Sequence, residues 1–292
     1  MSEEAHAARG AQAAGAAHAA GAAGAAHAAQ WLPWLERAAR LAMRGHGRAE
    51  PNPMVGCVVL DAQGAVAGEG YHARCGGPHA EVEALQRAGA RARGGTAVVT
   101  LEPCNHTGRT GPCSVALMKA GVARVVYACT DPAVPAAGGA EALRAAGVEV
   151  LQVPCEAAER VTAPFLHRVR TGLPWVTAKW AQSADGLLVA PPGRDRWISG
   201  PRSRAKVHGE RGRVDVVLTG MGTVVADDPL LTARCQRPLR QPLRVVWDPR
   251  LELLLGAQLV RTAKDWPVVA ACLPGADYAR SAHAAPRCGR LV

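Results

Sequence analysis

The segment from Pro78 to Cys113 constrains the chain more than any other, because it places a histidine, a carboxylate and two cysteines at fixed spacings. His79 and Glu81 stand two residues apart at the opening of a helix-like segment, Cys104 follows an apolar run, and Cys113 opens the next helix-like segment. A catalytic zinc ion takes three protein ligands and leaves one position open for water. The segment therefore predicts zinc ligands at His79, Cys104 and Cys113.

Glu81 is too close in sequence to His79 to serve comfortably as a second ligand, but it is well placed to reach a zinc-activated water. A carboxylate in that position acts as the general acid and base of a deaminase that uses His-x-Glu and a later Pro-Cys pair. Eight residues separate Cys104 from Cys113, where two is the common spacing. The alternative is a structural zinc site, in which His106 would be the fourth ligand.

Composition narrows the function classes further. The 292 residues suit two domains, and the net charge of +10 permits binding of nucleic acid or of phosphorylated metabolites. No dense Lys/Arg tract is present, so nucleic acid is not expected as a partner. Nine cysteines at irregular spacings do not indicate a disulfide framework, which favours a reducing cytoplasm. No apolar run predicts a membrane span or a signal peptide.

The pattern of elements predicts an α/β fold in two domains. Residues 1–30 form an Ala/Gly-rich extension that we expect to be disordered, residues 31–172 form the zinc domain, and residues 173–292 form a second domain. In the zinc domain, helices are predicted at 31–44, 78–88, 113–120, 141–146 and 156–170, and strands at 55–60, 65–72, 96–100, 122–129 and 148–153.

The residue pattern of the second domain indicates its function less clearly. Strands are predicted at 175–179, 214–219, 243–247 and 268–273, and a basic helix at 201–211. Gly220-Met221-Gly222-Thr223 is predicted as a glycine turn, which could admit a phosphate but is by default a plain turn. The arginines in this half are equally consistent with a solvated basic surface.

Several motifs give the zinc domain a more specific resemblance: Pro51-Asn52-Pro53-Met54-Val55-Gly56, Gly70-Tyr71-His72, His79-Ala80-Glu81-Val82, Glu102-Pro103-Cys104, Gly108-Arg109-Thr110 and Pro112-Cys113. The region from Trp31 to Gly172 resembles the deaminase half of the bifunctional riboflavin-biosynthesis deaminase–reductase family. The resemblance implies a three-layer, cytidine-deaminase-like fold and a pyrimidine substrate that carries a phosphoribosylamino group. It also implies that Asn52 and His72 contact the base or sugar and that Arg109 meets the phosphate.

The second half resembles the reductase of the same family, which is similar in fold to dihydrofolate reductase and uses NADPH. The resemblance implies cofactor contacts at Lys179, Ala181, Trp197, Thr223 and Asp227. It implies substrate contacts at Asp195, Arg211, Leu231 and Arg234. Asp195 departs from the family, which has a serine there.

The family's reductase continues beyond residue 292, so we expect a truncated domain with exposed apolar sheet surface and weak or absent reductase activity. The expected function is zinc-dependent deamination of 2,5-diamino-6-(phosphoribosylamino)pyrimidinone to the corresponding uracil. In the family, NADPH-dependent reduction of the ribosyl group to a ribityl chain follows. The alternatives are a nucleoside or tRNA-adenosine deaminase, a non-catalytic zinc protein that binds nucleic acid, and an inactive fragment. The sequence leaves a homo-oligomer open.

Overall fold

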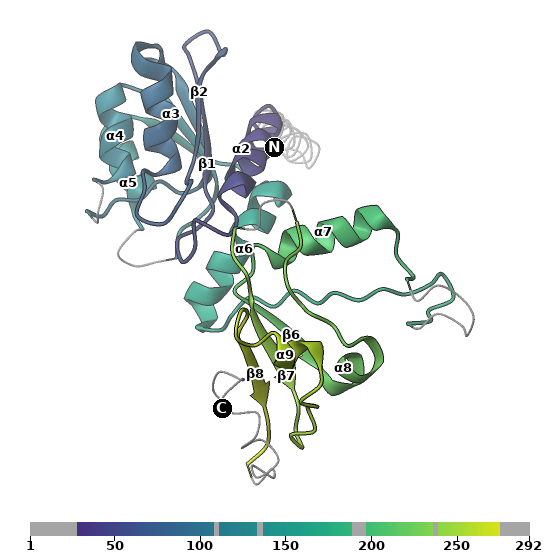
Figure 1. Cartoon of the computed structure of the whole chain (residues 1–292). Helices are drawn as coiled ribbons and strands as arrows, with labels where there is room; N and C mark the ends of the chain where they lie inside the picture. The colour runs from purple at the N-terminus through teal and green to yellow at the C-terminus, as the bar shows by residue number, and fades with distance from the viewer. Residues whose placement is uncertain (1–27, 108–110, 133–136, 189–196, 236–238, 275–292) are drawn as a thin grey trace, which may run out of the picture. The chain divides into compact units, whose positions relative to one another are not determined.

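The computed structural model describes residues 28–107, 111–132, 137–188, 197–235 and 239–274 (Figure 1). The chain divides into two compact units, Met1–Val176 and Thr177–Val292. None of the described helices is both long and apolar enough to cross a membrane.

The first unit is built on a five-stranded sheet in the order β2-β1-β3-β4-β5. Its strands are β1 (Gly56–Leu60), β2 (Val66–Tyr71), β3 (Thr96–Leu101), β4 (Arg124–Cys129) and β5 (Glu149–Gln152). β1 runs antiparallel to β2 and to β3, whereas β3, β4 and β5 are parallel. The α/β class predicted from the sequence is confirmed.

Helices cover the sheet as a three-layer sandwich (Figure 1). The helices of this unit are α2 (Leu32–Ala42), α3 (Ala80–Ala88), α4 (Cys113–Ala120), α5 (Gly139–Ala145) and α6 (Glu156–Thr171), with short 3-10 turns at Met43–Gly45 and Gly89–Ala92. α2 and α6 pack on each other and on the central strands, while α3 packs on β1 and β2 and is followed along its layer by α4 and α5. The valines of β1, β3 and β4 form the buried core between the helical layers.

Glycines in β2 let α3 lie directly against the sheet. A β-carbon at Gly68 would overlap the carbonyl oxygen of Ala84, and one at Gly70 would overlap that of Ala80. Since real β-carbons do not approach backbone oxygens so closely, only glycine permits this packing. The result fixes the N-terminal end of α3, where His79 and Glu81 stand.

The second unit has a parallel three-stranded sheet in the order β6-β7-β8. Its elements are α7 (Pro201–Arg211), β6 (Val216–Gly220), α8 (Met221–Asp227), β7 (Leu243–Trp247), α9 (Gln258–Arg261) and β8 (Val268–Ala271). Its hydrophobic core includes Val246, Leu259, Val260 and Val268. Apolar side chains are exposed on β6 and β7, with Leu218 65% and Trp247 50% exposed.

The strand predicted at 175–179 is wrong, because that backbone is irregular. Trp175 is 51% exposed and Val176 79% exposed, so the apolar residues that favour a strand have no surface to bury against among the described residues. Strand propensity reports how well a residue fits a half-buried, paired surface, and an unpaired segment does not provide one.

The glycine turn predicted at 220–223 is also wrong. Gly220 has an extended backbone and caps the N-terminus of α8, which begins at Met221 and includes Gly222. Neither glycine adopts a positive φ, so the turn conformation that the pair suggested is not used. In addition, β8 ends at Ala271 rather than at residue 273, and α9 was not predicted.

Candidate metal centre and active site

Three donor atoms meet at the N-terminal ends of α3 and α4. His79 is the N-cap of α3, Cys113 is the first residue of α4, and Cys104 lies in the loop after β3. The imidazole Nδ1 of His79 lies 3.2 Å from Cys113 Sγ and 3.5 Å from Cys104 Sγ, and all three donors lie within 4.8 Å of one another. A nitrogen and a sulfur ligand of tetrahedral zinc are about 3.6 Å apart, given Zn–N and Zn–S bonds of about 2.1 and 2.3 Å. The donor set and its spacing therefore fit zinc.

The protonation of these three donor groups is also suited to binding of a metal cation. Hydrogen bonds, first from Cys113 and then from His79, lower the pKa of the Cys104 thiol to about 4. Cys113, the donor in that pair, has its pKa raised, first by the hydrogen bond with Cys104 and then by burial. The hydrogen bond with Cys104 raises the pKa of His79. A metal ion would replace the shared protons, since thiolate and neutral imidazole are the forms that bind zinc.

Glu81 stands beside these donors in the first turn of α3 and is only 3% exposed. Burial is the main cause that raises the pKa of its carboxyl to about 7, and the positive charge of His79 opposes that rise. A hydrogen bond links Glu81 to Cys113. A carboxyl with this pKa exchanges its proton readily at neutral pH, as a general acid and base must.

His106 does not join the metal donors. Within the part of the chain that the structure describes, the group of closely spaced donors contains three members and His106 is not among them. The Nδ1 atom of His106 is buried without a hydrogen-bond partner. Three donors from the described residues would leave the fourth position of a tetrahedral zinc open for water, as in a catalytic site.

Backbone contacts hold the two cysteines in place. The N–H of Cys113 donates to Cys104 Sγ at 3.4 Å, and the N–H of Ser114 donates to the carbonyl of Cys104 at 3.1 Å. The Ser114 hydroxyl donates to Asn105 Oδ1 at 2.7 Å. Glu102 is buried and accepts a hydrogen bond from the N–H of Ala140. The sequence analysis missed Glu102 and Ser114 as supports of the site; a glutamate next to a Pro-Cys ligand was the available signal.

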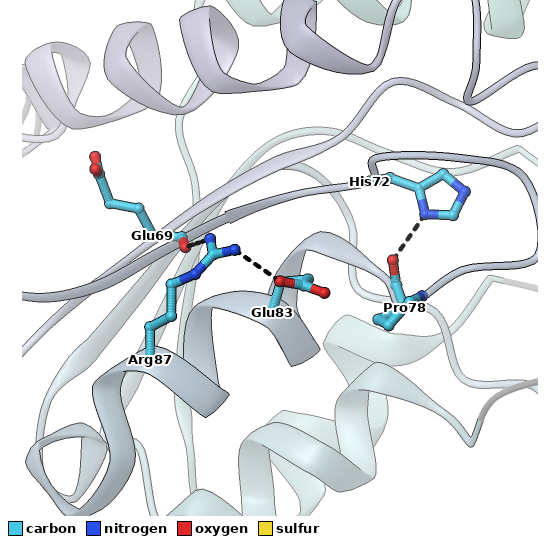
Figure 2. A network of polar contacts seen from close by, with 5 residues as sticks. All are labelled: Glu69, His72, Pro78, Glu83 and Arg87. Atoms are coloured by element: carbon cyan, nitrogen blue, oxygen red, sulfur yellow. Dashed lines mark hydrogen bonds and ion pairs between the residues drawn. The ribbon is translucent and has the colours of Figure 1, made fainter.

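Asn52 and His72, predicted to bind the substrate, are brought to the same region. His72 Nδ1 lies 2.9 Å from the carbonyl oxygen of Pro78, the residue before the ligand His79, and the contact is drawn in Figure 2. Because Nδ1 donates there, Nε2 accepts from Asn52 Nδ2 at 3.1 Å. The His72 and His79 rings meet edge to face with centroids 5.4 Å apart. Burial lowers the pKa of His72, which favours this neutral form.

Figure 2 also shows how α3 is tied to β2 beside this network: the Arg87 guanidinium donates to the carbonyl of Glu69 and to the carboxylate of Glu83. Two predicted substrate contacts, Arg109 and Asp195, lie outside the described residues.

The remaining predicted residues belong to the second unit. Arg211 ends α7 and is half-buried, Arg234 follows a loop, and each lies within electrostatic range of the other. Leu231 is 4% exposed, with φ at 56°. The predicted NADPH contacts Lys179, Trp197, Thr223 and Asp227 are exposed and Ala181 is partly buried.

Comparison with known families agrees with both units. Residues 29–129 match the cytidine and deoxycytidylate deaminase zinc-binding region, and residues 174–279 match the RibD C-terminal domain. The riboflavin biosynthesis protein RibD of Escherichia coli (strain K12) is 46% identical over 226 residues, covering 73% of this chain and 61% of that protein. RibD of Mycobacterium tuberculosis (strain ATCC 25618 / H37Rv) is 48% identical over 211 residues, covering 70% and 62%. The chain thus spans less than two thirds of these relatives.

Solved structures give the same assignment. RibD of Acinetobacter baumannii (form 1) superposes with a TM-score of 0.69 at 40% identity, covering 87% of this chain and 72% of that chain. A Thermotoga maritima protein, described as a diaminohydroxyphosphoribosylaminopyrimidine deaminase/5-amino-6-(5-phosphoribosylamino)uracil reductase, superposes with a TM-score of 0.76 at 33% identity, covering 91% and 74%. These matches confirm the predicted fold class, and the chain belongs to the RibD family of riboflavin biosynthesis proteins.

Proposed function

We propose that the first unit catalyses the hydrolytic deamination of a pyrimidine that carries a phosphoribosylamino group. The observation that carries this proposal is the buried Glu81 carboxyl beside the donor atoms of His79, Cys104 and Cys113. The Thermotoga maritima relative is described as a deaminase of that substrate class, which supports the same choice of substrate.

In this reaction, zinc held by His79, Cys104 and Cys113 would supply Lewis-acid activation of water. Glu81 takes a proton from the water that attacks the amine-bearing ring carbon. It then delivers the proton to the amino group, the carbon–nitrogen bond breaks, and ammonia leaves as a ring carbonyl forms. A pKa of about 7 suits Glu81 to both transfers, because it can hold and release a proton at the same pH.

We assign substrate positioning to Asn52 and His72, whose hydrogen-bonded pair ends at the carbonyl before His79. Neutral His72 and an amide offer polar contacts to a base or a sugar without adding charge. Arg109, in the loop between the cysteines, would take the phosphate, for which a guanidinium fork is apt.

The test is release of ammonia from 2,5-diamino-6-(phosphoribosylamino)pyrimidinone by the purified chain, with bound zinc quantified in the same sample. We expect turnover that scales with zinc content. Cytidine and a tRNA adenosine serve as competing substrates. Deamination of either, without deamination of the phosphoribosylated pyrimidine, would contradict the proposal.

For the second unit we propose NADPH-dependent reduction of the deaminated product. The match of residues 174–279 to the RibD C-terminal domain supports this, together with the arginine pair Arg211 and Arg234. Consumption of NADPH after deamination, with NADH as the control, measures it. The slow reductase turnover expected from the sequence stays a prediction of that experiment. Thiolate ligands and a phosphorylated metabolite suit a reducing cytoplasm, which we propose as the compartment.

A further inference from the structure

We propose that His208 is a positioning residue of the second unit, which holds the backbone at Arg234 so that Arg234 and Arg211 bind one phosphate monoester together. The proposal rests on the reductase function proposed above, because the phosphate would be that of its phosphoribosylamino substrate. His208 is not among the contacts that the family resemblance implies.

The loop that carries Arg234 is held by three side chains, those of Arg244, Gln241 and His208. Arg244, on β7, donates from Nη1 to the carbonyl of Leu230 at 3.1 Å. Gln241, just before β7, accepts from the N–H of Ala233 at 2.9 Å and donates to its carbonyl at 3.0 Å. His208, on α7, accepts at Nδ1 from the N–H of Arg234 at 3.3 Å. A backbone fixed at both ends and in the middle presents a side chain with little loss of entropy on binding.

The guanidiniums of Arg211 and Arg234 carry the same charge, and each lies within electrostatic range of the other. Burial first, and then the charge of Arg234, lower the pKa of Arg211. One of the five N–H groups of the Arg234 guanidinium donates a hydrogen bond to the hydroxyl of Thr232, at 3.5 Å. In the described part of the chain neither arginine forms an ion pair with a carboxylate. Two guanidiniums that no described carboxylate neutralises favour a dianion that accepts hydrogen bonds from both, and a phosphate monoester does so.

His208 lies three residues before Arg211, so both project from the same side of α7. Burial first, then the charges of Arg234 and Arg211, lower the pKa of His208, and a hydrogen bond with the backbone of Thr232 opposes them. Arg204, one turn earlier, is directed instead at the Trp197 ring, with its guanidinium carbon 4.7 Å from the ring centroid.

The charge state decides what His208 can do. A neutral imidazole has a lone pair to accept the N–H of Arg234, whereas an imidazolium has only donors. Protonation would remove the contact that orients Arg234 and add a third positive charge to the site. The role of His208 in the free protein is therefore to hold the loop and not to attract the anion by its own charge.

The test compares His208→Leu with His208→Asn in the full chain, with ribose 5-phosphate as the probe and ribose as the control ligand. Asparagine keeps an acceptor near the position of Nδ1, whereas leucine removes it and is the better helix former. We expect His208→Leu to weaken ribose 5-phosphate binding about fivefold, the effect of one lost hydrogen bond, and His208→Asn to stay within about twofold of the parent protein. Arg211→Gln is measured alongside by calorimetry, and its loss of affinity shows how much of the ribose 5-phosphate binding occurs at this site.

A second measurement separates positioning from packing. The ring signal of His208, assigned among the ten histidines by its loss in His208→Asn, is followed against pH by NMR. Saturating ribose 5-phosphate should shift the pKa of His208, because a bound dianion changes the charge that Arg211 and Arg234 exert on the imidazole, and ribose should not. Equal affinity of His208→Leu and the parent, or a His208 signal that ignores the phosphate, would overturn the proposal. NADPH consumption is measured on the same samples, so failure of the proposed reductase function is seen independently of phosphate binding.

Discussion

The buried carboxylate of Glu102 accepts a hydrogen bond from the N–H of Ala140, 3.1 Å away, and so ties the loop before the zinc ligand Cys104 to the start of α5. Gly139 lies so close to this loop that a β-carbon at its position would overlap the carbonyl oxygen of Pro103. The position of Cys104 thus depends on a helix that begins well beyond it in the chain.

Replacing Gly139 with alanine should therefore damage the metal centre from outside it. The added methyl group cannot enter the space of the Pro103 carbonyl, so either α5 or the loop that holds Cys104 must shift. We expect lower zinc content per chain, and ammonia release reduced about tenfold or more, since small displacements of positioned groups are costly in catalysis.

Gly111→Ala is the matched control for this substitution. Gly111 is in the same region of the chain, two residues before Cys113, and a β-carbon there would meet no atom within 4 Å. Zinc content and activity should remain close to those of the parent protein. An equal loss in both variants would mean that loop composition, and not the contact with Pro103, is responsible.

Glu81→Gln should separate metal binding from proton transfer. Glutamine has nearly the same shape and keeps polar atoms in the buried position, but it cannot take up and return a proton. We expect zinc content to be unchanged and kcat for deamination to fall by a factor of at least about 10² to 10⁴. Zinc is quantified on the same preparation used for the ammonia assay, and substantial residual turnover would refute the assigned role.

Glu83 provides the comparison on the same helix. Its carboxylate is partly exposed and receives a hydrogen bond from Arg87 at 2.9 Å (Figure 2). Glu83 is not among the closely spaced metal donors of the described residues. Glu83→Gln removes an exposed ion pair between residues four apart, which contributes only about 0.3–0.5 kcal/mol. Its kcat should match that of the parent protein.

Much of this site follows from local sequence signals. Three local patterns each span only a few residues: the His79-x-Glu81 pair, the apolar run before Cys104 and the helix that begins at Cys113. The structure brings the donor atoms of His79, Cys104 and Cys113 together. Glu102 was missed because its partner Ala140 is 38 residues away and contributes only a backbone N–H. A side-chain pattern in the sequence does not predict a hydrogen bond between a carboxylate and a distant backbone N–H.

The second unit was harder to predict for a related reason. The segment 175–179 has strand-forming residues, yet a strand exists only where another strand pairs with it, and that is a property of the fold. Conversely, Gly220 and Gly222 suggested a turn, whereas Gly220 supplies a helix cap without a positive φ. Local composition indicates which backbone conformations are low in free energy, and tertiary packing decides which of them the folded chain adopts.

Removal of zinc by a chelator should abolish ammonia release and lower the melting temperature of the first unit. His79, Cys104 and Cys113 come from α3, the loop after β3, and α4, so a metal bound to all three stabilises the folded state by mass action. Addition of zinc should restore both properties. Full activity in a sample shown to be metal-free would rule out the proposed role of the centre.

The stability of the second unit should depend on Arg244, which is completely buried on β7. Its guanidinium donates to the carbonyls of Leu230, Leu259, Trp266 and Pro267 and to the hydroxyl of Thr262. Lysine in its place would keep the charge but has only three donors at one point, so several buried carbonyls would lose their partners. We expect Arg244→Lys to lower the free energy of unfolding of this unit by about 2–4 kcal/mol.

Arg250→Lys is the control for that change, since Arg250 is 81% exposed and pairs only loosely with Glu252 at 3.3 Å. Exposed substitutions of this kind alter stability by less than about 0.5 kcal/mol. Denaturant unfolding is followed by tryptophan fluorescence, and ammonia release measured in parallel reports on the first unit alone. Because the deaminase residues all lie in the first unit, Arg244→Lys should unfold the reductase part at lower denaturant while ammonia release persists. Loss of both together would show that the two units unfold as one.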